Sequence, residues 1–500
     1  MGEIPCREGK TLIRPIVRSE EAPFGLLLYC PTKCSALAGF LLALQMRLAR
    51  YCLEYKNMPV YPIPPKRTSI HPFVGLLAVW SLAAFPLSFV FPFDIKVVLY
   101  LALLAIAIHV LRSNKEARQS YGEMKSVTLA FGLYAPYSLI GIWVHHGVIS
   151  SADNGVHLLY FLGIAACFAV IPSRRIFWCG LSAAAMAAGA LAVYQRVGLG
   201  IDRPYGLFGI NELGLSGSIK FGMVTTVFTL LALYAALDSC LPRRFRFWHA
   251  ASALAGLAGC LAIASRGPWL ALFVTGGAII AVKAMQLDRR RRLIAAVTLL
   301  AGTVLFAALF YSELHARYLS TIAELTAMRG GDLNTSIGGR LVMWKAALTM
   351  FLAHPVLGVG MNQFGQHLRE MVALGQAPEF VAIFSQTHNE YLEALATGGV
   401  IGIAYFLWLL GAPLTLFLRQ LSRQHAAGGN TAAPAGGLIV IAAFALFATT
   451  DNIFDRQMTT SLFAFLTLGF AVMSVHRVPA SASARDGHAE QRDRETVVNL

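Results

Sequence analysis

The chain has 500 residues, of which 56% are hydrophobic and 13% are charged, and its mean hydropathy is +0.60. This composition excludes an ordinary soluble protein and predicts a polytopic membrane protein. The formal net charge of +15 would favour nucleic acid as the partner of a soluble chain. Here the basic residues cluster in short loops between apolar runs, as orientation signals do, so we expect membrane lipids and no nucleic acid as partners.

Residues 1–70 form a lead-in that we expect to be cytoplasmic or interfacial. The apolar run at residues 24–48 is interrupted by Pro31 and Lys33 and lacks a small-residue cleavage site after a clean apolar core, so we do not interpret it as a signal peptide. The sequence leaves open whether this run is an interfacial helix or a membrane span. It also leaves open whether residues 1–57 are translated, because Met46 and Met58 are alternative starts.

Apolar segments long enough to span a bilayer then follow in series, and they predict about twelve transmembrane helices. Nine lie within residues 71–311 and three within residues 394–476. The segments are 72–92, 95–112, 127–148, 156–172, 176–198, 214–237, 248–264, 268–286, 293–311, 394–418, 436–450 and 459–475. A long, partly helical loop at residues 312–393 separates the ninth helix from the tenth. The fold class is therefore an all-α polytopic membrane protein.

The loops that connect these segments alternate in charge. Every second loop is basic: residues 112–125, 173–175, 242–246, 289–292, 419–423 and 476–477. The loops between them are poor in Lys and Arg or mildly acidic. The positive-inside rule then places both termini in the cytoplasm and the loop at 312–393 outside. The polar tail at 477–500 is low in aromatic residues, and we expect it to be disordered.

The long polar stretch, residues 311–395, ends in Thr387-His388-Asn389-Glu390 directly before an apolar run. The spacing predicts a helix start at which Thr387 and Glu390 form a capping box. His388 would then lie in the first turn, where the helix dipole lowers the pKa of imidazole and keeps the ring neutral near pH 7. A neutral histidine at a membrane surface is a candidate general base, although its position alone also fits a polar residue at a loop border.

Four arginines lie on the predicted outer side, against the orientation bias: Arg203, Arg266, Arg340 and Arg456. A cation kept at such a position is costly, and it is a functional candidate by default. The alternative for each is an interfacial side chain or a structural ion pair. We favour the ion pair for Arg456, because Asp451 and Asp455 precede it closely.

Three arginines and a histidine on one face suit the displacement of a pyrophosphate leaving group by a hydroxyl. Guanidinium groups bind phosphate oxygens bidentately, and a neutral imidazole accepts the hydroxyl proton. No cysteine lies within residues 311–395 and no carboxylate cluster is evident there, so we expect neither a disulfide across the loop nor a metal, and no cofactor. Nucleotides are not expected outside the cell, so the activated donor should be carried by the membrane.

An ordered set of motifs carries a resemblance to a known family. The motifs are Ser265-Arg266-Gly267 between two spans, Gly339-Arg340-Leu341 with Trp344, residues 354–360 with Phe364, residues 387–393, and residues 397–402. In this order they resemble the O-antigen ligase and polymerase superfamily, from about residue 72 to residue 476. The closest resemblance is to bacterial O-antigen ligases, which join a polysaccharide from undecaprenyl pyrophosphate to the lipid A core oligosaccharide.

The resemblance implies a GT-C-like fold in the inner membrane of a Gram-negative bacterium, with the active site facing the periplasm. It implies that His388 activates the acceptor hydroxyl, that Arg266 and Arg340 hold the donor pyrophosphate, and that Arg203 assists. The family has an asparagine-proline-asparagine-like turn after this last arginine, whereas Gly209-Ile210-Asn211 stands here, which weakens the assignment of Arg203. The implied reaction is a metal-independent, inverting glycosyl transfer.

Two alternatives remain open. A polymerase or a protein O-oligosaccharyltransferase of the same superfamily would use the same site with another acceptor. A transporter whose arginines bind an anionic lipid headgroup would more often carry its charges at mid-membrane in broken helices. Two glycine motifs have simpler interpretations: residues 358–360 as a tight turn, and Gly398 with Gly402 as a close helix contact. Glu390 and Glu393 are interpreted as capping and helix-face residues.

Overall fold

The computed structural model describes residues 72–475, apart from residues 92, 172, 208–213, 295, 298–307 and 309–310. By its internal contacts the chain divides into two units, Met1–Glu54 and Tyr55–Leu500, and all described residues belong to the second. The predicted lead-in, the tail, most of the predicted span at 293–311 and the turn at Gly209-Ile210-Asn211 lie outside the described residues.

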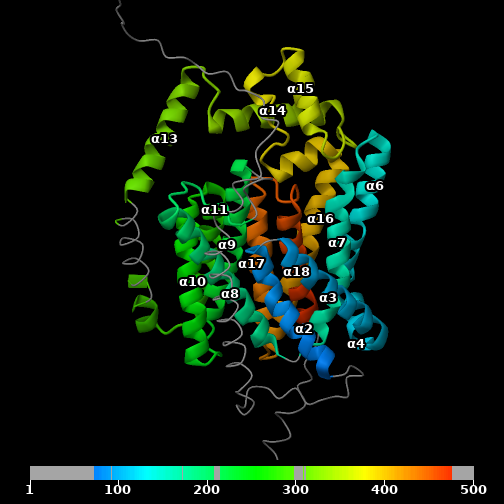
Figure 1. The fold of residues 1–500 in the computed structure, drawn as a ribbon, viewed down its shortest axis with the longest axis vertical. Helices are drawn as coiled ribbons and strands as arrows, with labels where there is room; N and C mark the ends of the chain where they lie inside the picture. Colours follow the sequence, from blue (N-terminus) through cyan, green and yellow to red (C-terminus); the bar gives the residue numbers. More distant parts are fainter. Residues whose placement is uncertain are drawn as a thin grey trace, which may run out of the picture. The chain divides into compact units, whose positions relative to one another are not determined.

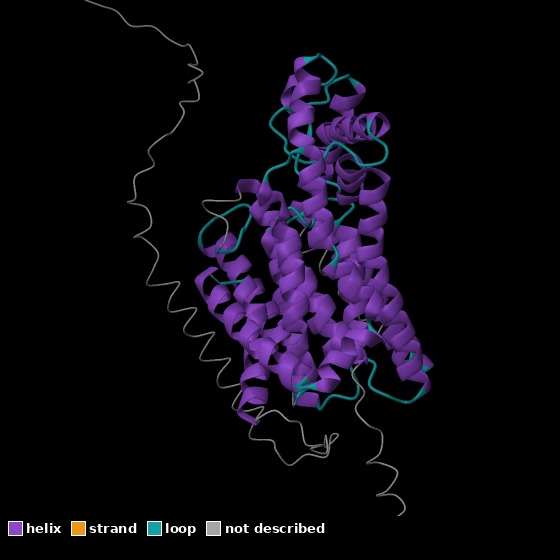
Figure 2. Cartoon of the chain, turned by 90° about the vertical axis from the view of Figure 1, so that its right-hand side faces the viewer, coloured by secondary structure: helices purple, strands orange, loops and turns teal. Residues whose placement is uncertain are grey.

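Every regular element of the described residues is a helix (Figures 1 and 2). The α-helices are α2 (Pro72–Ala84), α3 (Phe93–Ser113), α4 (Lys115–Glu123), α5 (Lys125–Gly132), α6 (Tyr134–His145), α7 (Asp153–Ile164), α8 (Arg174–Val193), α9 (Gly214–Ala236), α10 (Arg243–Ile263), α11 (Arg266–Met285), α13 (Tyr311–Arg329), α14 (Ser336–Ala353), α15 (Phe364–Ala373), α16 (Glu390–Ala426), α17 (Ala432–Phe447) and α18 (Gln457–Val475). Short single-turn helices lie at Phe85–Phe89, Ile149–Ala152, Ala165–Ala169, Tyr194–Gly198 and Glu379–Val381.

Seven helical stretches among the described residues are long and apolar enough to cross a membrane, and the bent pair of α3 and α4 adds an eighth if it is one span. Three further apolar helices, Phe73–Phe89, Gly155–Ala169 and Ala432–Phe447, are shorter. All of them fall on predicted segments except α4, which lies in the predicted basic loop at residues 112–125. The all-α polytopic membrane fold is therefore confirmed, whereas the total of about twelve spans stays a prediction.

Helix α18 is the most enclosed of the described helices long enough to span a membrane, and all of its residues from Thr459 to Val475 are buried. The ring of Phe465 packs against rings from four other positions, with the shortest centroid distance, 4.6 Å, to Phe85. Aromatic pairs of this kind add to the stabilisation that burial alone supplies. They hold α18 firmly, and with it the turn at residues 451–456 that precedes it.

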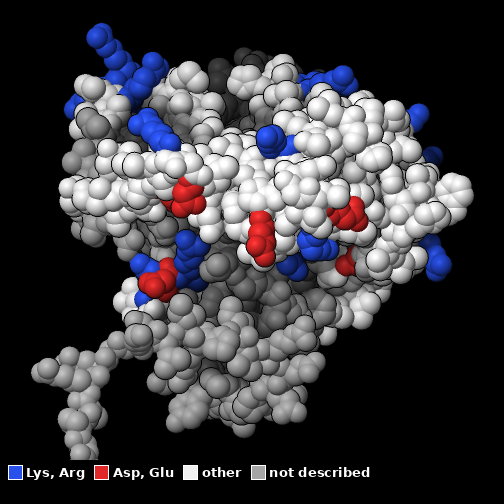
Figure 3. Space-filling view, turned by 90° about the horizontal axis from the view of Figure 1, so that it is seen from above, with Lys and Arg blue, Asp and Glu red and all other residues white. Residues whose placement is uncertain are grey.

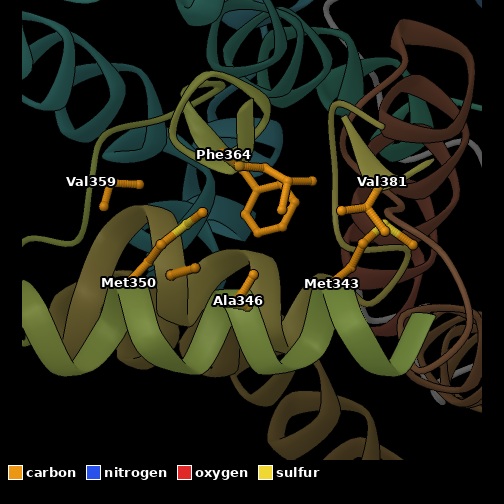
Figure 4. Close-up of a cluster of buried hydrophobic side chains, with 9 residues drawn as sticks. Met343, Ala346, Met350, Val359, Phe364 and Val381 are labelled. Atoms are coloured by element: carbon orange, nitrogen blue, oxygen red, sulfur yellow. The ribbon is translucent and has the colours of Figure 1, made fainter. Parts of the chain in front are cut away.

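Helices α14 and α15 lie over one end of the membrane helices, with α13 beside them, and we call α13, α14, α15 and the turn Glu379–Val381 the cap (Figure 1). The cap has its own apolar core, in which Met343, Ala346 and Met350 of α14 face Phe364 of α15 and Val381 (Figure 4). The buried members of this cluster also include Val359, Leu368 and Ala396. Because Ala396 belongs to α16, the cluster joins the cap to the membrane helices. The predicted helical character of the long loop is confirmed.

Helix α16 is broken at Gly399, whose φ of 61° and ψ of −153° are not helical. The segment at residues 355–360 restores the hydrogen bonds that the break removes. The amides of Val359 and Gly360 donate to the carbonyls of Ala396 (3.0 Å) and Thr397 (2.9 Å), and the amide of Val400 donates to the carbonyl of Pro355 (2.9 Å). Backbone groups near a membrane must be paired, so this exchange permits the break.

The turn predicted at residues 358–360 therefore serves as the docking segment for the break in α16. Gly358 has a φ of +66°, and a Cβ there would lie 2.4 Å from the carbonyl carbon of Thr397. The hydrogen bonds between residues 355–360 and α16 also fix the direction of residues 390–398, the part of α16 next to His388. The expected close helix packing at Gly398 and Gly402 is a side-chain contact instead, because the hydroxyl of Tyr137 approaches both glycines.

We predict that Gly358→Ala destabilises the protein more than Gly375→Ala does. Both glycines have a positive φ, +66° and +70°, but a Cβ on Gly375 meets nothing within 4 Å. Gly375→Ala, the control, should lower the free energy of unfolding only by the strain of a left-handed alanine, about 1–2 kcal/mol. Gly358→Ala should lower it further, because its Cβ also clashes with the backbone of Thr397. Thermal unfolding of the purified protein in detergent measures both. Equal losses would show that the cap does not depend on close contact with α16.

Candidate active site

The chain turns sharply at His388, which has a left-handed φ of 52°. Helix α16 begins at Glu390 and is capped by Asn389, whose side chain accepts from the amides of Tyr391 (3.1 Å) and Leu392 (3.2 Å). The predicted capping box of Thr387 with Glu390 is wrong. Asparagine is as good a cap as threonine, and it moves the start of the helix two residues along the chain.

The two glutamates of the first turn bind backbone groups other than those predicted. Glu393 Oε2 accepts from the amide of Thr387 (2.9 Å), and Glu390 Oε2 accepts from the amides of Ile453 (2.7 Å) and Phe454 (3.3 Å). The amide of Glu390 donates to the carbonyl of Ala448 (2.8 Å). These bonds tie the start of α16 to the segment that joins α17 and α18.

His388 therefore precedes the helix and is held by a carboxylate rather than by a place in the first turn. Its Nδ1 lies 2.9 Å from Oδ1 of Asp451, and its side chain is 20% exposed. Trp344 Nε1 donates to the carbonyl of Thr387 (3.1 Å), and the ring of Phe384 stands edge-on to the imidazole at 6.0 Å. A carboxylate at Nδ1 selects the tautomer with the proton on Nδ1, which leaves Nε2 able to accept a proton.

Asp451 belongs to a buried ionic cluster. Its side chain is 1% exposed, and its Oδ2 lies 2.9 Å from the ammonium of Lys220, which is 0% exposed on α9. The same ammonium lies 2.7 Å from Oδ1 of Asp455 and donates to the carbonyl of Asn452. Two carboxylates and a carbonyl thus surround one cation, which is the environment that a buried lysine needs.

The pKa of Asp451 is set by opposing effects. Burial would raise the pKa, but the charge of Lys220 and the hydrogen bond and charge of His388 hold it well below its usual range. The carboxylate is therefore ionised at every working pH. An ionised Asp451 both orients the imidazole of His388 and stabilises the imidazolium that forms when the ring takes a proton.

Arg340 and Arg266 lie in the same electrostatic neighbourhood. Burial lowers the pKa of the Arg340 guanidinium, Asp451 raises it, and Arg266 lowers it as a like charge. No carboxylate forms an ion pair with Arg340 within the described ranges. Arg266, the first residue of α11, is half-exposed, with its Nη2 3.4 Å from Oε1 of Glu324 on α13. The charge of Arg340 thus interacts with Arg266 and with Asp451, the partner of His388, although these residues come from different elements.

The other two arginines behave differently. Arg203 is exposed, its carbonyl accepts from the hydroxyl of Ser218 (2.8 Å), and the described residues show no contact between its side chain and the three residues above. Its role stays a prediction. Arg456 Nε lies 3.7 Å from Asp455 Oδ2, as expected for an ion pair, but Asp451 pairs with Lys220 and His388 instead.

Lys220 and the function of Asp451 were missed by the sequence analysis. Lys220 lies inside a predicted span, and a lysine in an apolar span was the signal that could have found it. Asp451 was assigned to Arg456 because of their proximity in sequence. Among the described residues, no three from His, Cys, Asp and Glu are grouped in a way that would hold a metal ion.

Comparison with known proteins supports the resemblance found in the sequence. A family model described as O-antigen ligase matches residues 250–407. The matched region contains Arg266, Arg340 and His388, and it ends before Asp451. A protein of Haemophilus influenzae that carries no functional name is 23% identical over 310 residues, which are 61% of this chain and 75% of that protein. Residues 250–407 are therefore similar to the O-antigen ligase family, in agreement with the superfamily that the motifs indicate.

We predict that Lys220→Met strongly destabilises the protein near pH 7, by about 3–5 kcal/mol, because it removes the ammonium that pairs with the buried Asp451 and lies closest to Asp455. Lys345→Met, the same change at an exposed position of α14, serves as the control. Thermal unfolding in detergent measures both variants. A loss no larger than that of the control would contradict the role given to the buried cation.

The pH dependence provides a second readout of the same variant. In the wild type the folded-state pKa of Asp451 lies below its unfolded value, so its contribution to stability is full above about pH 4 and is lost as the pH falls through the folded pKa. Without Lys220, we expect burial to outweigh the remaining effect of His388 and to raise the pKa of Asp451. We therefore expect the Lys220→Met protein, unlike the wild type, to gain stability when the pH falls from about 7 to 5.

Proposed function

We propose that this protein, with its O-antigen ligase domain, transfers a polysaccharide from undecaprenyl pyrophosphate to a sugar hydroxyl of the lipid A core oligosaccharide. The observation that carries the proposal is the position of His388. Its imidazole is bound to the ionised Asp451, in the same electrostatic neighbourhood as Arg340 and Arg266. A base and two cations so placed match the needs of pyrophosphate displacement.

In this mechanism Nε2 of His388 takes the proton of the acceptor hydroxyl as its oxygen attacks the anomeric carbon of the donor glycan. The new bond joins the acceptor oxygen to that carbon, and the bond from the carbon to the pyrophosphate oxygen breaks with both of its electrons. Undecaprenyl pyrophosphate leaves as the anion. Asp451 stabilises the imidazolium until the proton passes to water.

The arginines bind the pyrophosphate and stabilise the charge that grows on it. Arg340 has no carboxylate partner among the described residues, so its guanidinium is available to phosphate oxygens. The Arg266 pair with Glu324 is long, 3.4 Å, and a phosphate can replace it. Attack opposite to the leaving group inverts the anomeric centre and needs no covalent enzyme intermediate. We propose that Arg203 assists from the neighbouring loop.

The proposed setting is the inner membrane of a Gram-negative bacterium, with both termini in the cytoplasm and the cap in the periplasm. The polyprenyl chain would enter from the lipid, while its pyrophosphate reaches the arginines at the membrane surface. On the described part of the face seen in Figure 3, basic side chains gather near one edge, and over the rest side chains of both charges are scattered singly among uncharged residues. Pyrophosphate recognition is thus assigned to individual arginines.

We predict that His388→Ala and Asp451→Asn each lower the rate of transfer by about 10²- to 10⁴-fold. The first removes the base, and the second removes the charge that orients it and stabilises its protonated form. The assay combines purified protein, carrier-linked glycan and rough lipopolysaccharide, with a chelator and without nucleotide. Full activity of the Asp451→Asn protein would contradict the role of the pair. Lengthening of the carrier-linked glycan without modified lipopolysaccharide would favour a polymerase, and absence of both products from the wild type would favour transport.

In the same assay we predict that Arg340→Ala and Arg266→Ala each lower the rate by about 10²- to 10³-fold, since each removes a preorganised donor to the leaving group. Arg340→Lys should recover only part of the loss, because an ammonium cannot bind phosphate bidentately. Arg369→Ala, on the exposed face of α15, is the matched control and should stay active. Unchanged rates for both site variants would exclude the pyrophosphate site.

A further inference from the structure

A cavity of about 340 Å³ lies beside the start of α16 and is separate from the residues assigned to transfer. Its walls come from α6, α16, the cap-side segments at 361–362 and 385–386, and the turn at 452–456. Neither His388 nor Arg266 nor Arg340 lines it. Figure 1 shows α6, which forms one wall, on the side of α16 opposite to α11, which carries Arg266.

The chemistry of the walls excludes a lipid tail. Polar side chains make up most of the lining, including three tyrosines, three carboxylates and Asn452. Asn452 is 3% exposed, and its Oδ1 has no hydrogen-bond partner among the described residues. A buried acceptor without a partner is costly, and it favours a ligand that brings a donor.

The described walls offer a phosphate no free cation. Arg456 is the single cation in this lining, and its Nε already lies near Asp455. The carboxyl groups of Glu390, Glu393 and Asp455 instead offer hydrogen-bond acceptors to hydroxyl groups. The cavity thus favours a neutral ligand rich in hydroxyl donors, the opposite of what the arginine side favours.

Tyrosine rings supply the apolar part of the surface. The rings of Tyr137 and Tyr405 are stacked at 4.7 Å, and the ring of Tyr134 stands edge-on to Tyr405 at 5.6 Å. The small residues Gly398 and Gly402 leave room for the hydroxyl of Tyr137. Aromatic surface next to well-placed polar groups is suited to a sugar ring, which has apolar C–H faces and a rim of hydroxyls.

We propose that this cavity binds a neutral sugar unit of the acceptor oligosaccharide. The inference rests on the proposed function for its choice of the acceptor rather than the donor. Glu393, on the cavity wall, also binds the amide of Thr387, the residue before His388, so a sugar held there lies next to the base. The donor pyrophosphate is attracted to the arginines on the other side of α16. The cavity beside α6 is then available to the acceptor.

Filling the cavity tests the proposal without removing a capping group. Ala394 lines the cavity, whereas Ala404 lies on the exposed face of the same helix, so Ala394→Leu and Ala404→Leu form a matched pair. The binding probe is the core oligosaccharide of rough lipopolysaccharide, freed of acyl chains and phosphates, titrated calorimetrically into the full chain in detergent. We expect Ala394→Leu to weaken binding by about tenfold or more, and Ala404→Leu to leave it unchanged.

Two further measurements keep the test decisive. Ser385→Leu narrows the cavity from an exposed cap-side segment and should weaken binding even if Ala394→Leu does not fold. Arg266→Ala should leave oligosaccharide binding intact while weakening binding of inorganic pyrophosphate. Oligosaccharide binding that is insensitive to both cavity variants would overturn the proposal.

Kinetics separate this inference from the proposed function. In the transfer assay the cavity variants should raise the KM for the lipopolysaccharide acceptor by about tenfold and leave the KM for the carrier-linked donor unchanged. A raised donor KM instead would overturn the assignment to the acceptor. If the cavity variants transfer glycan with a normal acceptor KM, the cavity is not the acceptor site, whereas the proposed ligase function stands. If the wild type shows no transfer but binds oligosaccharide, and the cavity variants lose that binding, the ligase function is wrong and the cavity still binds a sugar.

Discussion

The buried contact of Lys220 with Asp451 and Asp455 is the interaction on which the rest of the site depends. One ammonium from α9 holds together the turn before α18, and that turn presents Asp451 to His388. Desolvating an isolated ion would cost several kcal/mol, so the cluster is stable only as a complete set. In the proposed mechanism, Asp451 is both part of this structural ion cluster and the carboxylate that orients the base. This explains why so costly an arrangement lies at the end of the most enclosed helix.

The cap supplies the second constraint. Breaking α16 at Gly399 frees backbone groups, and the segment at 355–360 pairs with them. The first turns of α16 can therefore point away from the line of the membrane-spanning part, toward the cap. Glu390 and Glu393 then connect these turns to the turn at 453–454 and to Thr387. His388 is positioned by a backbone that three separate elements determine, which is the rigidity that a positioned base requires.

Sequence reasoning found the residues that stand out locally and missed those defined by tertiary contacts. His388, Arg266 and Arg340 are predictable because each breaks a local expectation, and in the structure the charge of Arg340 interacts with Arg266 and with Asp451, the partner of His388. Their roles stay predictions. Lys220 does not stand out in the sequence, because one cation hardly lowers the mean hydropathy of an apolar segment of about twenty residues. Proximity in sequence favours Arg456 as the partner of Asp451, whereas the actual partner, Lys220, is brought close only by the tertiary structure. The capping register was ambiguous, since Thr387 and Asn389 are both good caps, and packing against residues 448–454 decided it.

The start of α16 divides two regions of opposite character, and this division itself favours a two-substrate transfer. On one side, cations with little carboxylate pairing attract an anion and stabilise its release. On the other, carboxyl groups and tyrosines offer hydrogen-bond partners to hydroxyl groups, and the single cation of the described lining, Arg456, lies near Asp455. A transporter for one anionic lipid would need only the first region, whereas transfer from a charged carrier to a neutral sugar needs both. His388 lies at the boundary, where the oxygen of one substrate must meet the carbon of the other, so the charge asymmetry would separate the substrates before the base acts.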